Sequence, residues 1–354
     1  MLEVPTGPNE VKIVANMAWP SFRNVAIDLC KALSPLCQPV VFDLSEASPG
    51  GRVILVETIK KDTFKFIKER LHGSDVVLYG PTEGHSILDE ESRAVARDIK
   101  VVAVSHFVKK MLEEIDVTVA GVVHHGVDME FRDVDPDLVE LIESRVRGRL
   151  MALTVAGNDP RKGVQELLHA YRIVEEEVPD SFLIVHSQPK TYYNPVERRF
   201  KKRFCDLPGL SSALGIERIW LTASHGLLTP QQVNALYSCC SVYVSSSLSE
   251  GFGLPILEAF RFNKPVVAVD APPFNEVIED GITGKLFEFE KVKWVNYKSS
   301  IRFKLHSYSP RRLAEAIVSL LSDRSKLKAM SRRINESKYR WDIRAVYPRL
   351  LDFF

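Results

Sequence analysis

Two carboxylates, Glu250 and Glu258, bracket a turn that contains Gly251 and Gly253. Carboxylates are hydrogen-bond acceptors only, and the hydroxyl groups of sugars are donors that suit them. The two glycines allow a tight turn in which the backbone comes close to a ligand. A helix that begins directly after such a turn offers unpaired N–H groups and a partial positive charge, which together bind phosphate. A phosphate site between two hydroxyl acceptors fits a nucleotide-sugar.

The elements that must position these residues are a strand before the turn and a helix after it. Val242, Tyr243 and Val244 form a short apolar run that is typical of a buried strand. Pro255 suits the first turn of a helix. Glycine-containing turns of this kind also occur in ordinary α/β domains, so the glycines alone do not indicate a nucleotide-sugar site. The spacing of the two glutamates is what favours that interpretation.

Over residues 152–287 the sequence resembles the retaining GT-B glycosyltransferases of family 4 (glycosyltransferase group 1). The hallmark of that family is a glutamate followed, after seven residues, by a second glutamate, as Glu250 and Glu258 are here. Segments 263–267 and 275–284 are similar to the sequence that follows this motif in the family. The resemblance implies that Glu258 accepts hydrogen bonds from ribose and that Glu250 holds the transferred sugar. It implies the following donor-binding residues: Gly251, Phe252, Gly253, Leu254, Glu258, Gly157 and Asn158.

The loop 157–163 resembles the family's diphosphate-binding loop, in which basic side chains stabilise the departing nucleoside diphosphate. Lys162 matches that loop, whereas the family's earlier arginine is Asn158 here, and Arg161 is a candidate substitute. A basic residue at a helix start is unfavourable for the helix dipole, which argues against a purely structural role. We therefore expect Lys162, Arg161 and Glu250 to take part in catalysis.

Many members of the family carry a histidine of the first domain in the cleft. We predict that His85 has this catalytic role, because it lies in a loop after the buried strand 75–79. His106, at the start of a helix, is the alternative. The first half lacks the family's glycine-rich acceptor loop and has Trp19-Pro20-Ser21 instead.

The overall composition favours no particular class of macromolecular partner. The 354 residues are 45 % hydrophobic and 26 % charged, with a net charge of +1, so no global field favours nucleic acid or a membrane. The first residues do not show the pattern of a signal peptide, and since no apolar run reaches about 18–20 residues, we expect no membrane span. The five cysteines show neither metal-binding nor disulfide spacing, which fits a reducing cytoplasm. Asp133-Val134-Asp135 matches a metal-binding D-x-D pattern, but no apolar strand precedes it, so we predict no metal site.

Apolar runs alternate with helical patterns along the chain, which indicates an α/β protein with parallel sheets. Together with the resemblance, this predicts GT-B architecture: two Rossmann-like, doubly wound parallel-sheet domains that face a central cleft. We predict an acceptor domain over 1–132, a linker over 133–149 and a nucleotide-sugar domain over 150–338. Residues 339–354 have helical spacing, and the resemblance implies a helix that crosses back to the first domain.

Two further segments stand out, one for its charge and one because it departs from the family pattern. Segment 192–204 contains a basic run, Arg198 to Arg203, interrupted by Phe200. We interpret it as a charged surface helix; the alternative is peripheral contact with the inner face of the membrane or with a polyanionic acceptor. Segment 290–309 is an insertion whose structure the sequence does not predict.

The resemblance implies a retaining, metal-independent glycosyltransferase of hexosyltransferase type, with no cofactor and a UDP- or GDP-sugar as donor. The acceptor, whether a sugar, a glycan or a lipid-linked molecule, and the oligomeric state are not predicted. Two alternatives stay open at this point. One is a non-catalytic nucleotide-sugar-binding protein, and the other is a different GT-B enzyme such as an epimerase or a phosphorylase.

Overall fold

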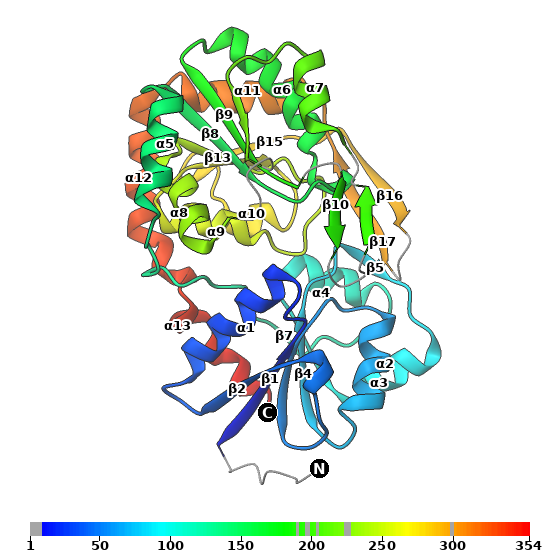
Figure 1. Cartoon of the computed structure of the whole chain (residues 1–354). Helices are drawn as coiled ribbons and strands as arrows, with labels where there is room; N and C mark the ends of the chain where they lie inside the picture. The colour runs from blue at the N-terminus through cyan, green and yellow to red at the C-terminus, as the bar shows by residue number, and fades with distance from the viewer. Residues whose placement is uncertain (1–8, 189–190, 195–198, 203–204, 223–227, 298–300) are drawn as a thin grey trace.

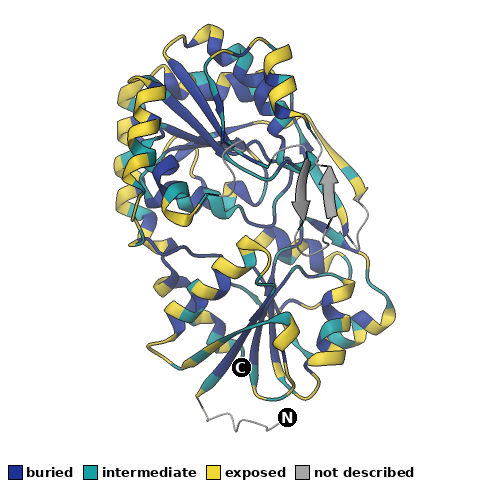
Figure 2. Ribbon diagram, in the orientation of Figure 1, coloured by how far each residue is buried: buried dark blue, intermediate teal, exposed yellow. Residues whose placement is uncertain are grey.

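The protein consists of two α/β domains, each built on a parallel six-stranded sheet covered by helices (Figure 1). The computed structural model describes residues 9–354 except 189–190, 195–198, 203–204, 223–227 and 298–300. Both sheets are buried, and exposed residues lie mainly on the outer faces of the helices (Figure 2). The predicted fold class, two parallel-sheet α/β domains, is confirmed.

The first sheet has the strand order β2-β1-β3-β4-β6-β7, and all its neighbouring strands are parallel. Its central strands are continuous apolar runs, because helices cover both faces of such a sheet. Its strands are β1 (Glu10–Ala15), β2 (Gln38–Asp43), β3 (Arg52–Val56), β4 (Asp75–Gly80), β6 (Lys100–Ala103) and β7 (Gly121–Val122). Its helices are α1 (Pro20–Leu33), α2 (Lys61–Arg70), α3 (Glu90–Asp98) and α4 (His106–Glu113).

The second sheet has the order β12-β9-β8-β13-β14-β15, again with parallel neighbours. The strand order reverses between β8 and β13, and ligands of such sheets bind at this switch point, beyond the carboxyl ends of the strands. Its strands are β8 (Leu150–Val155), β9 (Ser181–His186), β12 (Ile219–Leu221), β13 (Val242–Val244), β14 (Val266–Val269) and β15 (Gly284–Phe287). Its helices are α6 (Val164–Glu177), α7 (Leu207–Ala213), α8 (Pro230–Cys239), α9 (Leu254–Arg261), α10 (Phe274–Val277), α11 (Pro310–Leu321) and α12 (Arg324–Ser337).

The insertion at 290–309 forms a hairpin that joins the two domains. Strands β16 (Lys291–Tyr297) and β17 (Ile301–Ser307) pair antiparallel, and β17 also pairs with β5 (Gly84–Ser86) of the first domain. The other end of β17 is bonded to the second domain, because the His306 amide donates to the Leu248 carbonyl at 2.7 Å. This inserted hairpin (β16–β17) therefore spans the domain boundary, on the right-hand side of Figure 1.

The basic segment is a second hairpin, so the predicted surface helix is wrong. Strands β10 (Thr191–Asn194) and β11 (Arg199–Lys202) pair antiparallel. Tyr192, Tyr193 and Phe200 favour strands over helices, and Pro195 stands between the two strands, where a helix would need a backbone donor. Arg198 and Arg203, at the ends of the basic run, lie outside the described residues, and the predicted membrane contact stays a prediction.

Most of the predicted linker is helical. Helix α5 (Pro136–Val146) packs against α8 of the second domain, and Asn234 Nδ2 donates to the Asp133 carbonyl at 2.9 Å. Pro136 at the first turn and the Asp135 carboxylate, which accepts from the Leu138 amide at 2.9 Å, explain why a helix begins there. The passage between the domains thus lies before Asp133.

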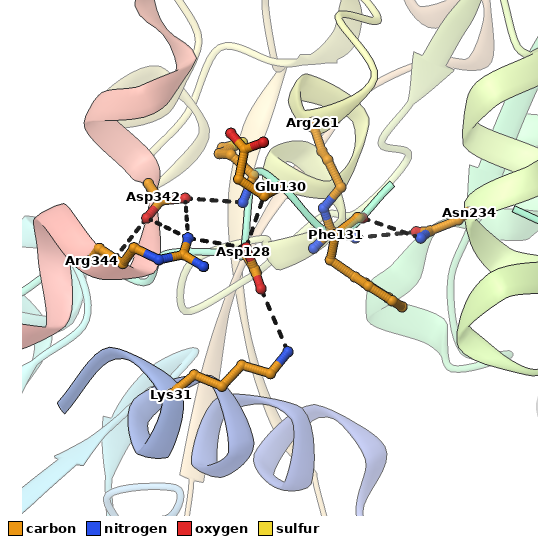
Figure 3. A network of polar contacts seen from close by, with 9 residues as sticks. Lys31, Asp128, Glu130, Phe131, Asn234, Arg261, Asp342 and Arg344 are labelled. Carbon is orange, nitrogen blue, oxygen red and sulfur yellow. Dashed lines mark hydrogen bonds and ion pairs between the residues drawn. The ribbon is translucent and has the colours of Figure 1, made fainter. Parts of the chain in front are cut away.

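Charged side chains surround that passage (Figure 3). Asp128 accepts from Lys31 of α1 at 3.5 Å and from Arg344 of the C-terminal segment at 3.1 Å. Asp342 accepts from the Met129 amide at 3.1 Å and also contacts Arg344. These contacts connect α1, the interdomain passage and the C-terminal segment.

The C-terminal segment returns to the first domain, but it is not the single helix that its spacing predicts. It is divided into a 3₁₀ turn at Lys338–Trp341, α13 (Ile343–Val346) and a 3₁₀ segment at Tyr347–Phe353. Asp342 is extended and caps the next turn, and Pro348 lacks the N–H that a continuing helix would need. The Tyr347 hydroxyl donates to the Gly126 carbonyl at 3.0 Å. In the described part of the chain, none of the helices combines the length and apolar character needed to span a bilayer.

Candidate active site

A small pocket lies at the switch point of the second sheet, between the ends of β8 and β13 and the start of α9. Predicted residues Lys162, Glu250 and Gly253 line it. The remaining lining residues come from the two strand ends and the first turn of α9: Thr154, Val155, Ala156, Tyr243, Ser245, Ser246, Ser247, Pro255 and Ile256. The pocket is therefore where the sheet topology places a ligand.

Oppositely charged side chains meet at one end of this pocket. Glu250 accepts hydrogen bonds from Lys162 Nζ, from Arg161 at 3.2 Å and from the Ser247 hydroxyl at 2.8 Å. The Arg161 guanidinium also donates to the Ser249 carbonyl at 3.1 Å. The structure thus brings together the three residues for which the sequence predicts a role at the diphosphate and the transferred sugar.

The charges of this group shift one another's pKa values. Burial alone would raise the pKa of Glu250, but the positive charges of Lys162 and Arg161 lower it to about 2. Burial and the charge of Arg161 lower the pKa of Lys162, whereas Glu250 opposes that change. For Arg161, burial acts to lower the pKa, but nearby carboxylates raise it above its ordinary value. Glu250 is therefore ionised at neutral pH and serves as the counter-ion of both cations.

Backbone contacts fix the loop that carries the cations against the strand end that carries Glu250. Gly163 has φ +60°, and a Cβ atom on it would lie 2.0 Å from the Ser246 carbonyl oxygen. The Ser246 hydroxyl donates to the Lys162 carbonyl at 2.8 Å, and the Leu248 amide donates to the Arg161 carbonyl at 2.7 Å. A glycine at 163 is thus required for the close approach that brings Lys162 to Glu250.

Helix α9 begins at Leu254, and Gly253, Pro255 and Ile256 at its start line the pocket. A turn later on the helix, Glu258 Oε2 accepts a hydrogen bond of 2.7 Å from the Tyr237 hydroxyl. Tyr237 is buried, so this bond fixes the orientation of the carboxylate. The arrangement provides a helix N-terminus for phosphate and an oriented carboxylate acceptor on the same helix.

The turn between Ser249 and Gly253, called the signature turn below, packs directly against the first domain. A Cβ atom at Gly251 would lie 2.4 Å from the Pro81 side chain, so a glycine is required there. The Ser105 hydroxyl donates to the Gly251 carbonyl at 2.7 Å. Phe252 is buried between His125, His124 and the C-terminal segment, so it offers a ligand its backbone and not its ring.

The predicted donor-binding residues Gly157 and Asn158 follow β8, next to the pocket. The Asn158 side chain is almost fully buried and donates to the carbonyls of Gln188 at 3.2 Å and Cys205 at 2.7 Å. Its Oδ1 accepts from the Cys205 amide at 3.2 Å. The side-chain amide of Asn158 thus holds neighbouring loops together. The family that the sequence resembles has an arginine at this position.

The two histidines proposed for the cleft lie at opposite ends of α4, with His85 beside Glu114 at its C-terminal end and His106 at its first residue. His85 is part of β5, where its Nε2 contacts Glu114 at 2.7 Å and its ring stacks on Trp294 with centroids 4.5 Å apart. Among the described residues, the hydrogen bond and the ring contact of His85 are made with Glu114 and Trp294, away from the group of Arg161, Lys162 and Glu250. The predicted loop at His85 is a strand because the inserted hairpin pairs with it.

His106 lies at the domain boundary, near a carboxylate of the second domain. Both oxygens of Glu276 accept backbone N–H groups at the start of α4, from His106 and Phe107 at 2.8 Å. His124 Nε2 lies 3.3 Å from the same carboxylate. Ligand atoms of His106, His124 and Glu276 lie within 4.8 Å of one another, close enough to hold a metal ion, but the observed contacts show that Glu276 caps α4.

Sequence reasoning missed Glu83. Its carboxylate comes from the first domain and lies 3.2 Å from the Arg161 guanidinium, with only 13 % of the side chain exposed. The loop after β4 was expected in the cleft because it follows a parallel strand, and the carboxylate in that loop was a signal for a polar contact. We use the name charge cluster for Glu83, Arg161, Lys162 and Glu250.

Residues 149–323 match the family model described as "Glycosyl transferases group 1". Over 281 residues the chain is 21 % identical to "Uncharacterized glycosyltransferase 335" of Sulfolobus islandicus rod-shaped virus 1. This match covers 78 % of this chain and 79 % of the viral protein. Over 155 residues it is 34 % identical to the "MMP alpha-(1->4)-mannosyltransferase" of Mycolicibacterium hassiacum. This second match covers 43 % of this chain and only 34 % of the mannosyltransferase.

The fold is similar to that of solved glycosyltransferase structures. The crystal structure of Anabaena Alr3699/HepE in complex with UDP-glucose matches with a TM-score of 0.69 at 16 % sequence identity. The match covers 97 % of this chain and 98 % of HepE. The family model, the related sequences and the two-domain fold agree, and the chain belongs to the GT-B glycosyltransferases of group 1.

Proposed function

We propose that this glycosyltransferase moves a hexose from a UDP- or GDP-sugar to an acceptor hydroxyl, with retention of the anomeric configuration and without a metal ion. The observation that carries the proposal is that Lys162 and the start of α9 line one pocket and that Arg161 contacts Glu250, another residue of its lining. The two cations and the helix start offer positive charge for two phosphates at a place where the sheet topology favours a nucleotide.

Each part of the donor has a candidate partner. Lys162 and Arg161 bind the diphosphate and stabilise the charge that develops on it as the sugar departs. Glu258, oriented by Tyr237, accepts hydrogen bonds from ribose hydroxyls. Glu250 and the backbone of the signature turn hold the transferred sugar. Without ligand, Glu250 neutralises both cations, so binding of the diphosphate exchanges one anionic partner for another.

The proposed reaction keeps the acceptor on the same face of the sugar as the leaving group. The acceptor oxygen forms a bond to the anomeric carbon, while the bond from that carbon to the β-phosphate oxygen breaks and its electron pair stays on the phosphate. The hydroxyl proton passes to the departing diphosphate. Glu250 orients the sugar in this scheme and forms no bond to it. Two fixed cations supply the charge stabilisation for which a metal ion would otherwise be needed.

The names of the relatives support the choice of donors. The HepE structures contain UDP, UDP with glucose, and UDP-glucose, and the mycobacterial relative is a mannosyltransferase. These proteins are distant or only partly matched, so they indicate which hexose donors to try first. We propose a sugar, a glycan or a lipid-linked molecule as acceptor.

Incubation of the protein with UDP-glucose, UDP-N-acetylglucosamine or GDP-mannose and a panel of saccharide acceptors tests the proposal. We expect release of one nucleoside diphosphate, a product whose anomeric proton shows retention by NMR, and the same rate in the presence of EDTA. Lys162→Ala should abolish turnover, whereas Glu315→Gln on the outer surface should not change it. Inversion at the anomeric carbon would refute the retaining mechanism, and loss of activity in EDTA would refute metal independence. Tight donor binding without turnover would instead favour a nucleotide-sugar-binding protein.

A further inference from the structure

Glu83 is a first-domain carboxylate placed at the charge cluster of the second domain. Its Oε1 lies 3.2 Å from the Arg161 guanidinium, and the side chain is largely buried. The loop that carries it follows β4, so it belongs to the face of the first sheet that opens toward the other domain. In a two-domain transferase whose second domain binds the donor, this face is the one that presents the acceptor.

Two groups of the second domain hold the backbone of Glu83 in place. Its carbonyl accepts hydrogen bonds of 3.0 Å from both the Ser249 hydroxyl and the Lys304 amide. Ser249 belongs to the signature turn and Lys304 to strand β17 of the inserted hairpin. The insertion therefore has a consequence at the active site, because it fixes the position from which the Glu83 side chain reaches Arg161.

Binding of the donor must change the partner of Glu83. The cluster contains two carboxylates and two cations, and the proposed diphosphate needs both cations. A phosphate that binds Arg161 displaces the Glu83 carboxylate, which stays beside the leaving group because its backbone is held. A carboxylate in that position is a hydrogen-bond acceptor directed at the place where an acceptor hydroxyl must arrive for same-face attack.

We propose that Glu83 is a catalytic residue that accepts the hydrogen bond of the attacking acceptor hydroxyl and orients its oxygen toward the anomeric carbon. The inference rests on the proposed function and adds the group on the acceptor side. The bond from the hydroxyl oxygen to the anomeric carbon forms and the bond to the β-phosphate oxygen breaks. The hydroxyl proton, which is hydrogen-bonded to Glu83 before the reaction, moves to the departing diphosphate oxygen beside it as that bond breaks. The acceptor class that fits a carboxylate partner is an alcohol, such as a saccharide hydroxyl, and not an anionic oxygen.

Glu83→Ala and Glu83→Gln distinguish this role from that of a counter-ion for Arg161. We expect Glu83→Ala to lower transfer to a saccharide acceptor about 100-fold, because the attacking oxygen is no longer positioned. Glu83→Gln keeps an oxygen that accepts a hydrogen bond and should retain at least about ten times more transfer than Ala. The affinity for UDP, measured by calorimetry, should stay equal or rise in both variants, since the phosphates no longer have to displace a carboxylate from Arg161. Donor hydrolysis to water without acceptor should fall much less than transfer.

The matched control is Glu90→Gln, which removes an exposed carboxylate paired with Arg97. It should leave transfer, hydrolysis and UDP affinity unchanged. A parallel loss of UDP affinity and of transfer in Glu83→Ala would mean that Glu83 acts only through Arg161, and unchanged transfer would mean that it has no role; either result overturns the inference. If the wild-type protein releases no nucleotide from any donor, the proposed function fails, and the inference fails with it.

Discussion

Replacing Glu250 by Gln should destabilise the empty protein at neutral pH and relieve part of its sensitivity to acid. The carboxylate accepts from Lys162, Arg161 and Ser247 in a site where only 12 % of its side chain is exposed. Its pKa lies at about 2 instead of 4.5, and a neutral Gln resembles the protonated acid. A difference of about 2.5 pKa units corresponds to about 3 kcal/mol, which is the expected loss of unfolding free energy at pH 7.

The sign of the pH dependence follows from the lowered pKa. The stabilisation by Glu250 is complete above pH 4.5, the ordinary pKa, and it disappears as the pH falls toward the folded-state value of about 2. The difference in unfolding free energy between wild type and Glu250→Gln should therefore narrow by about 1 kcal/mol between pH 7 and pH 3.5. Below that pH the two proteins should continue to converge.

Urea unfolding at pH 7, 4.5 and 3.5 measures this difference directly. The control is Glu315→Gln, an exposed carboxylate paired with Arg311, which should cost less than about 0.5 kcal/mol at every pH. Equal stability of wild type and Glu250→Gln at pH 7, or a difference that does not shrink in acid, would refute the assignment of Glu250 as the buried counter-ion. UDP should restore part of the stability of the variant, because the diphosphate supplies the missing negative charge.

Two further substitutions test the supports of the site. Gly163→Ala adds a Cβ atom 2.0 Å from the Ser246 carbonyl oxygen. Gly148 has the same kind of φ but no atom within 4 Å of the added Cβ, so Gly148→Ala should lower the unfolding free energy by about 1–2 kcal/mol. Gly163→Ala should lower it by more. Similar unfolding free energies for these two variants would contradict the close approach. Asp128→Asn removes the contacts with Lys31 and Arg344 and should lower stability by about 1 kcal/mol, with faster hydrogen exchange over 343–353. Unchanged exchange in that segment would show that Asp128 does not hold it.

Local patterns predicted the parts of the site that lie within one stretch of chain. The strand at 242–244, the turn after it and the helix that contains Glu258 follow from apolar runs, glycines and Pro255. The contact between Lys162 and Glu250 was also within reach, because both residues follow strands that are neighbours in a parallel sheet. The roles predicted for Lys162, Glu250 and Glu258 came from the resemblance to a family, because the spacing of the residues alone does not give them.

Features that depend on contact between the domains were not predictable. Segment 84–86 is too short and polar to indicate a strand, and it becomes one only because β17 pairs with it. That pairing also explains why His85 is engaged by Glu114 and Trp294 while its neighbour Glu83 contacts Arg161. Asn158 lies in the predicted loop after β8, but the backbone groups that occupy its side chain come from distant loops.

Isothermal titration of UDP, GDP, ADP and NAD into the wild type and Glu258→Ala tests the central claim most directly. The account predicts that at least one of the three nucleoside diphosphates binds and that Glu258→Ala, which loses the ribose acceptor oriented by Tyr237, binds it at least tenfold more weakly. A concentration of about 100 times Kd should also add about 2.7 kcal/mol to the stability of the wild type. Binding of NAD alone, or no binding of any nucleoside diphosphate, would contradict the assignment of this pocket to a nucleotide-sugar donor.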